Sequence, residues 1–283
     1  MNGFISLYRV LTGKKVSSFR LLLYVFFGYA LSGRFDLLIY SVNTLIVAGG
    51  ILFASLLNDF YDYIELGEEN AVALFLKKKK LNRRSVNILI WAPWLISLGL
   101  FFLLLFLKVT LLSLLLLWAS FILCLLYSSP PARLKERKFW GLAAPPVGIF
   151  MLFFQALALI GFPEMKTLMI SALVFIYTWY LDFLHLAEDS VTEHETKKLS
   201  SSQSLAALKV TGVTGIAASL VFSAMHPVIL VSAAAWTLRI IAVFRTTPRQ
   251  IVKYRKNIFS RIYRIEEFMI YVLLSILHGM SIL

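Results

Sequence analysis

One acidic segment closes an apolar run in the first quarter of the chain. It reads Asn58-Asp59-Phe60-Tyr61-Asp62. In a helix Asn58 and Asp62 lie four residues apart on one face, and Asp59 lies three residues before Asp62. Amide and carboxylate oxygens are hard ligands of the kind that Mg²⁺ prefers. We therefore expect Asn58, Asp59 and Asp62 to bind a metal ion.

A second acidic segment closes a later apolar run. Asp182, His185 and Asp189 follow the spacing i, i+3, i+7 and share one helical face, and Glu193 comes one turn later. Two carboxylate-bearing helices that face each other would repel unless a cation lay between them. Mg²⁺ often binds through one or two carboxylates together with the phosphates of a substrate. A metal-bound diphosphate is therefore the ligand that these segments favour.

A basic segment lies between the two acidic ones. It reads Tyr127-Ser128-Ser129-Pro130-Pro131-Ala132-Arg133-Leu134-Lys135-Glu136-Arg137-Lys138. The two prolines stiffen it, and Arg133, Lys135 and Arg137 could hold phosphate oxygens. The alternative for each of these cations is a plain anchor at the membrane surface.

The elements that must position these segments are membrane-spanning helices. The chain has 283 residues, of which 59% are hydrophobic and 15% charged, and its mean hydropathy of +0.80 excludes a soluble enzyme. A spanning helix needs about 20 mostly apolar residues. Nine runs qualify: Val16–Leu31, Leu37–Leu57, Val86–Leu107, Thr110–Tyr127, Leu142–Gly161, Leu168–Leu186, Leu205–Met225, Val228–Phe244 and Glu267–Leu283. We predict an all-α, multi-pass membrane protein with one domain over residues 1–283, and no cleaved signal peptide.

The distribution of positive charge orients these helices. The chain carries 28 Lys and Arg against 15 Asp and Glu, a formal charge of +13. With a cytoplasmic N-terminus, only Arg34, Lys108 and Lys166 among the loop cations fall on the outer side. We therefore expect the site loops on the cytoplasmic side and the C-terminus on the opposite side. Anionic lipids and an anionic substrate account for the basic charge, so no nucleic-acid partner is needed.

The three segments together resemble the UbiA superfamily of intramembrane prenyltransferases. The first resembles the family's motif N-D-x-x-D-x-x-x-D, and the basic segment resembles its Y-S-x-P-P-x-R-L-K. The run from His185 to Asp189, with Asp182 upstream, lies where the second motif D-x-x-x-D would be. The order of the three segments, and their places at the ends of the second, fourth and sixth spans, carry the resemblance.

The resemblance implies a bundle of about nine helices around a central cavity, with a cytoplasmic polar cap. It implies an Mg²⁺-dependent enzyme that transfers an isoprenyl group from an isoprenyl diphosphate to a hydrophobic, aromatic or lipid acceptor. Asn58, Arg133, Lys135, Arg137 and Tyr127 would then hold the diphosphate. Asn58, Asp59, Asp62, Asp182, Asp189 and Glu193 would be metal ligands, and Asp62, Asp189 and His185 would be the catalytic residues.

Two positions depart from the family pattern. The third acidic position of the first motif holds Leu66, and Glu65 or Glu69 could take its place. In the second motif His185 replaces an aspartate, so it could act as a base or donate to phosphate, and Glu193 could compensate as a ligand.

Two other functions remain open. A terpene cyclase of the same fold would need no acceptor, because the prenyl cation closes on its own chain. A non-catalytic prenyl-lipid binder or a transporter ranks lower, because few polar side chains lie well within the spans.

Overall fold

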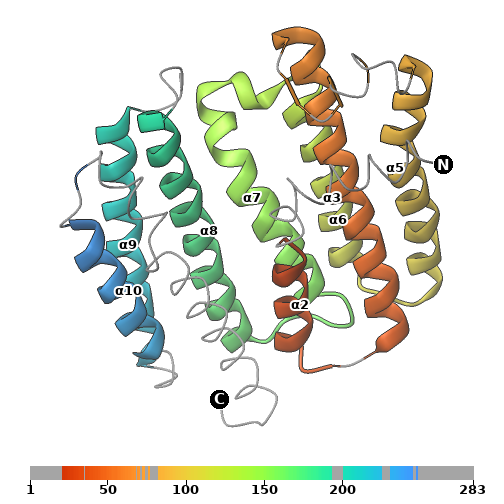
Figure 1. The fold of residues 1–283 in the computed structure, drawn as a ribbon. Helices are drawn as coiled ribbons and strands as arrows, with labels where there is room; N and C mark the ends of the chain where they lie inside the picture. Colours follow the sequence, from red (N-terminus) through yellow and green to blue (C-terminus); the bar gives the residue numbers. More distant parts are fainter. Residues whose placement is uncertain are drawn as a thin grey trace. The chain divides into compact units, whose positions relative to one another are not determined.

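The structure of the chain is a computed structural model. It describes residues 21–34, 36–67, 69–70, 72–73, 76, 82–192, 200–224, 230–244 and 247. Over these residues every regular element is a helix, as Figure 1 shows, so the predicted all-α class is confirmed.

Eight α-helices and one 3₁₀ turn make up the described part of the chain. They are α2 (Leu21–Leu31), α3 (Leu37–Leu66), α5 (Arg83–Phe106), α6 (Leu111–Ser128), η2 (Leu134–Glu136), α7 (Lys138–Leu157), α8 (Met165–Thr192), α9 (Ser201–Ser223) and α10 (Leu230–Phe244). Six of them, α3 and α5 to α9, are long and apolar enough to cross a membrane. By composition and fold the chain is an integral membrane protein.

Three of the nine predicted spans are not confirmed. The first is represented by α2, which has 11 residues, and the eighth by α10, which has 15. The ninth, Glu267–Leu283, lies outside the described residues. The number nine, the central cavity, the cytoplasmic cap and the orientation of the termini therefore stay predictions.

Side-chain caps fix where several helices begin and end. Asp36 accepts a hydrogen bond from Ile39 N at 2.9 Å at the start of α3, and Asn82 does the same for Ser85 N at 2.8 Å at the start of α5. These caps satisfy backbone donors that a helix start leaves unpaired. Gly67 ends α3 at a φ of 69°, the left-handed conformation that glycine adopts without strain. Because α3 ends only at this glycine, it extends beyond its apolar part and includes the first acidic segment.

The chain divides into two compact units. The first unit contains Arg34–Glu136, with α3, α5 and α6, together with residues through Tyr29 and Met151–Phe162. The second contains Arg137–Phe150 and Pro163–Leu283, with α8, α9 and α10, together with Ala30–Gly33.

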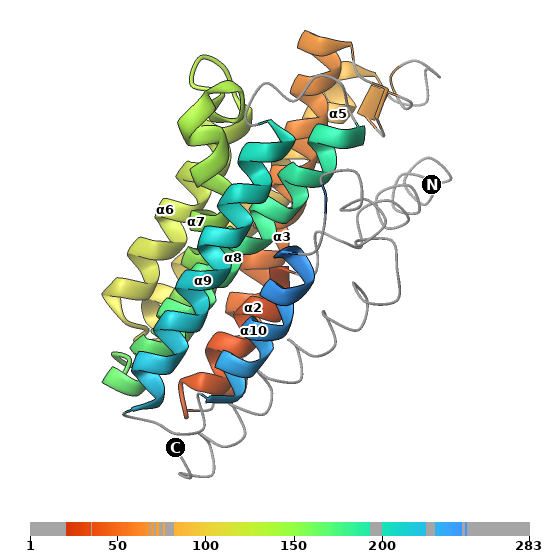
Figure 2. The ribbon, with the colours of Figure 1, turned by 90° about the vertical axis from the view of Figure 1, so that its left-hand side faces the viewer.

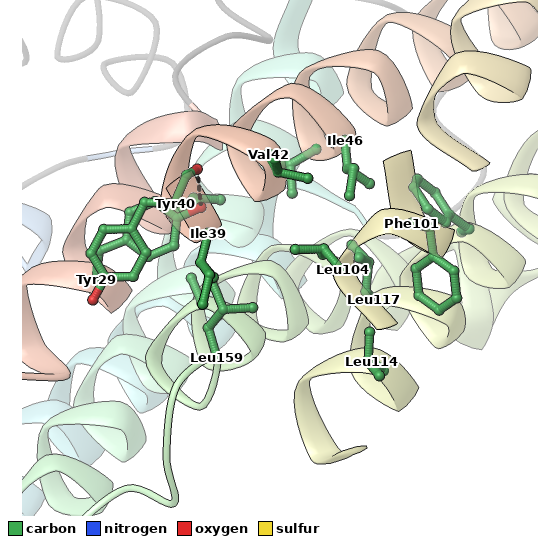
Figure 3. Close-up of a cluster of buried hydrophobic side chains, with 14 of the residues drawn as sticks. Tyr29, Ile39, Tyr40, Val42, Ile46, Phe101, Leu104, Leu114, Leu117 and Leu159 are labelled. Atoms are coloured by element: carbon green, nitrogen blue, oxygen red, sulfur yellow. Dashed lines mark hydrogen bonds between the residues drawn. The ribbon is translucent and has the colours of Figure 1, made fainter. Parts of the chain in front are cut away.

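In the first unit the helices meet through buried aliphatic and aromatic side chains. Figure 3 shows Ile39, Val42 and Ile46 of α3 in one cluster with side chains of α5 and α6. Close approach depends on small residues: a Cβ at Gly50 of α3 would overlap the ring of Phe121 on α6. In a lipid bilayer the burial of apolar side chains alone contributes little to helix association, so close packing contacts of this kind stabilise the helix pairs.

In the second unit α9 lies against both α8 and α10, side by side in Figure 1 and Figure 2. Trp236 of α10 contacts the rings of Tyr177 and Tyr180 of α8, with centroids 6.0 and 5.3 Å away. Gly215 of α9 leaves room for the same indole. Helices α8, α9 and α10 therefore pack against one another within the second unit.

Candidate functional site

The polar cluster of the first unit begins on the last turns of α3. Asn58, Asp62 and Glu65 follow the spacing i, i+4, i+7 and share one helical face. Asn58 Nδ2 donates to Asp62 Oδ2 at 2.7 Å, and the Asp62 side chain is only 10% exposed. The sequence-predicted pair of Asn58 and Asp62 is thus directly linked.

The segment between α6 and α7 folds back on itself near this face. Arg133 N donates to Ser129 O at 2.9 Å, and Glu136 N donates to Arg133 O at 3.0 Å, which forms the 3₁₀ turn η2. Arg133 has a φ of 34°, in the left-handed region that few non-glycine residues adopt. Such a conformation persists where the surroundings fix the side chain.

The surroundings of Arg133 fix its side chain in this way, because the guanidinium is nearly buried and meets three carboxylates. Nη2 lies 3.3 Å from Asp62 Oδ1, Nη1 contacts Glu65 Oε2, and Nε lies 3.0 Å from Glu136 Oε1. The Arg133 side chain is 7% exposed. A buried charge is tolerated when it is paired in this way.

Lys135 adds a second cation to the same carboxylate. Its Nζ donates to Asn58 Oδ1 at 3.0 Å and also contacts Asp62 Oδ1. Ser128 Oγ, at the end of α6, lies 3.5 Å from Asn58 Oδ1. We call Asn58, Asp62, Glu65, Arg133, Lys135 and Glu136 the charged cluster.

The ligand chemistry of the charged cluster fits Mg²⁺ as an incomplete site. Across the described residues, no three His, Cys, Asp or Glu side chains come together as a metal centre. Asn58 Oδ1 and the Asp62 carboxylate nevertheless supply two hard oxygen ligands on successive turns. Mg²⁺ commonly takes one or two such protein ligands and fills its shell with water and substrate phosphates. The residues present therefore suit a metal that arrives with a diphosphate.

The other predicted ligand of the first segment, Asp59, is buried on α3 beside the cluster face. It is 7% exposed, and its carbonyl oxygen accepts a hydrogen bond from Asn70 Nδ2 at 2.7 Å. Tyr127 is half-buried in the last turn of α6. Both residues belong to the first unit.

The predicted residues of the second segment belong to the second unit. Asp182 is half-buried on α8. His185 and Asp189 lie on the same helix, but their side chains are outside what the structure describes, as is Glu193 altogether. Arg137 precedes α7 and is exposed. For all these residues a role as ligand, base or diphosphate contact stays a prediction.

Two members of the charged cluster were not predicted as site residues. Glu136 pairs with Arg133 at i, i+3, a spacing that is visible in the sequence. Glu65 was considered only as a substitute metal ligand, and the structure instead pairs it with Arg133. Its place seven residues after Asn58 is the signal that could have assigned it to the cluster face.

Comparison with known proteins gives no match to any family model and none to any curated protein sequence. Solved structures do match. A UbiA homologue from Archaeoglobus fulgidus bound to GPP and Mg²⁺ has a TM-score of 0.69 at 15% identity, over 97% of this chain and 98% of that one. A UbiA homologue from Archaeoglobus fulgidus bound to DMAPP and Mg²⁺ has a TM-score of 0.67 at 15% identity, and one bound to Cd²⁺ has 0.70 at 15%, with the same coverage. The resemblance expected from the three motifs is confirmed at the level of the fold: this chain has the fold of the UbiA homologues.

Proposed function

We propose that this chain is a divergent member of the UbiA superfamily that transfers a prenyl group within the membrane. It would take an isoprenyl diphosphate as donor, a hydrophobic aromatic or lipid molecule as acceptor, and Mg²⁺ as cofactor. The observation that carries the proposal is the convergence of Arg133 and Lys135 on Asn58 and Asp62 at the end of a long apolar helix. The shared fold with a UbiA homologue that binds GPP and Mg²⁺ supports it.

The charged cluster supplies what a departing diphosphate requires. Asn58 Oδ1 and the Asp62 carboxylate would hold Mg²⁺, which when bound neutralises charge that builds up on the leaving diphosphate. As the sequence motifs imply, Asp59, Asp182, Asp189 and Glu193 are further candidate metal ligands. This ligand set is carried over from the sequence motifs.

The basic side chains would stabilise the same developing charge directly. Arg133 and Lys135 donate charge-assisted hydrogen bonds to diphosphate oxygens, and we expect Arg137 and Tyr127 to add contacts. When the allylic C–O bond breaks, its electron pair leaves with the diphosphate. The acceptor then adds to the allylic cation and loses a proton, for which we assign His185 as base. Catalysis of this kind rests on preorganised charge.

The proposal is tested with the full chain in lipid nanodiscs. Geranyl, farnesyl and geranylgeranyl diphosphate are supplied with Mg²⁺ and a mixture of aromatic and lipid acceptors, and released diphosphate is measured. We expect Asp62→Asn to lower release by a factor of about 100 or more, the range seen when a group that stabilises transition-state charge is removed. Asp189→Asn should do the same.

The matched control is Glu164→Gln. Glu164 is an exposed carboxylate that pairs with Lys166 at 3.5 Å, outside both acidic segments. The release rate of this variant should equal that of the unmodified chain. Full diphosphate release by Asp62→Asn would contradict the proposal.

The same assay separates the alternatives. A cyclase releases diphosphate without acceptor and yields a cyclic hydrocarbon or terpene alcohol, which mass spectrometry identifies. A non-catalytic binder retains the intact diphosphate and releases none. A transporter moves the substrate across sealed liposomes without cleaving it.

A further inference from the structure

We infer that Lys135 occupies the divalent-cation position of the first acidic segment until metal and diphosphate arrive. The ammonium and the metal would then compete for the same two oxygen atoms. This inference rests on the proposed function, since it concerns the same site. It adds which side chain contacts the Asn58 and Asp62 oxygens before metal and diphosphate bind.

The geometry that carries this inference is the bridge made by one ammonium group. Lys135 Nζ donates to Asn58 Oδ1 at 3.0 Å and contacts Asp62 Oδ1, so it joins two oxygens from successive turns of α3. A cation chelated by Asn58 and Asp62 would have to contact the same two atoms. Lysine and metal therefore cannot share them.

The charges of the cluster lead to the same conclusion. Arg133 and Lys135 together pair with Asp62, Glu65 and Glu136, and Asp62 Oδ1 receives both cations. A divalent ion on that oxygen would lie in contact range of an ammonium group. Like charges repel strongly at such distances when they are shielded from water. Metal binding must therefore displace one of the two basic side chains.

Lys135 is the side chain that can leave. Arg133 pairs with three carboxylates, and its backbone is hydrogen-bonded to Ser129 and to Glu136. The lysine ammonium sits on a flexible four-carbon stem, and the Lys135 side chain is 15% exposed. After displacement it becomes available to the oxygens of an arriving diphosphate. Metal and diphosphate would thus bind cooperatively. The metal displaces the Lys135 ammonium from Asn58 and Asp62, and the diphosphate provides new oxygen partners for that ammonium.

The test measures metal binding without diphosphate. The full chain is placed in nanodiscs of neutral lipid, and Mn²⁺ binding is followed by electron paramagnetic resonance. Lys135→Met keeps the apolar stem and removes the charge. We expect it to bind Mn²⁺ about tenfold more tightly than the unmodified chain, which corresponds to about 1.4 kcal/mol.

Three further variants locate the effect. Lys135→Arg keeps the positive charge and should show no gain in Mn²⁺ affinity. Lys166→Met removes a lysine that pairs with Glu164 outside the cluster, so it should match the unmodified chain. Adding Asp62→Asn to Lys135→Met should abolish the gain, because it removes the carboxylate charge for which lysine and metal compete.

Equal or weaker Mn²⁺ binding by Lys135→Met, in a sample that elutes as one species with an unchanged melting temperature, overturns the inference. If that variant does not fold, Lys135→Gln is judged by the same criterion. The two proposals fail separately. A tenfold gain in Mn²⁺ affinity, in a chain that releases no diphosphate, supports competition between Lys135 and the metal and contradicts the proposed enzymatic activity. Diphosphate release without a gain in Mn²⁺ affinity refutes only the competition.

Discussion

Arg133 and Asp62 form a buried ion pair across 71 residues of sequence, with Nη2 and Oδ1 3.3 Å apart. Their side chains are 7% and 10% exposed. The pair attaches the segment between α6 and α7 to the end of α3, and it coincides with a left-handed backbone at Arg133. The segment's position therefore depends on charge pairing as well as on its prolines.

The first prediction concerns the energy of this pair. Arg133→Met removes one of the two cations that contact buried Asp62 and leaves Lys135 in place, so the loss should be smaller than the cost of about 3–5 kcal/mol for a buried charge left without any partner. We expect that loss in the free energy of unfolding, measured by denaturant titration in detergent micelles. In the double variant Arg133→Met/Asp62→Asn the loss should be smaller than the sum of the two single losses. Strict additivity would mean that the two side chains do not interact.

The second prediction separates the two outer carboxylates that meet Arg133. Glu136 is 53% exposed and Glu65 is 34% exposed. Exposed ion pairs contribute at most about 1 kcal/mol because water screens them, so Glu136→Gln should change the free energy of unfolding by no more than that. Glu65→Gln should cost more than Glu136→Gln in the same titration. The reverse order would show that the helix-side carboxylate does not anchor the loop.

The sequence predicted the parts of the fold that depend on local apolar length. The second predicted span begins at Leu37, as α3 does, and the predicted third and fourth spans start and end within three residues of α5 and α6. The predicted apolar span ends at Leu57, nine residues before α3 ends, although the helical spacing of Asn58 and Asp62 already predicted a helix beyond it. Hydropathy falls once the acidic residues begin, whereas the helix continues to its glycine cap at Gly67.

The site could be predicted in part for a similar reason. The pairing of Asn58 with Asp62 follows from helical periodicity, whereas Arg133 and Lys135 were predicted as diphosphate contacts and not as partners of these two residues. The contact between Glu65 and Arg133 was not predictable, because it depends on the path of the loop from Ser129 to Glu136. That path is set by backbone hydrogen bonds and by the positive φ of Arg133, which charge and hydropathy patterns do not encode.

The third prediction concerns the close approach of α2 and α7 within the first unit. A Cβ at Gly28 would lie 2.5 Å from Phe153 O and 2.8 Å from Leu157 N. Both are backbone atoms, so no side-chain rotation can relieve the overlap. Gly28→Ala should therefore destabilise the fold by about 1–3 kcal/mol through overpacking. At Gly99 on α5, by contrast, no atom of the described residues beyond the adjoining helix backbone lies within 4 Å of the added Cβ. Gly99→Ala should leave stability unchanged or raise it by up to about 1 kcal/mol, and equal losses in both variants would refute the packing argument.

The fourth prediction concerns a polar contact inside the apolar core. Tyr29 OH accepts a hydrogen bond from Asn43 Nδ2 at 2.7 Å, and Asn43 is fully buried. The Tyr29 ring stacks on Tyr40, with centroids 4.1 Å apart and planes 8° from parallel. Tyr29→Phe keeps that stacking and removes only the hydroxyl. It should cost about 1–2 kcal/mol in the unfolding titration, because a buried donor loses its partner.

The double variant Tyr29→Phe/Asn43→Leu decides whether this cost comes from the hydrogen bond. Replacing both polar partners by apolar groups of similar shape is often nearly neutral, because no buried donor remains unsatisfied. We therefore expect the double variant to be more stable than Tyr29→Phe alone. If the two substitutions instead add their losses, the stabilisation comes from the shape of these side chains in the core shown in Figure 3. Recovery would show that Asn43 is tolerated in the apolar interior because Tyr29 accepts its hydrogen bond.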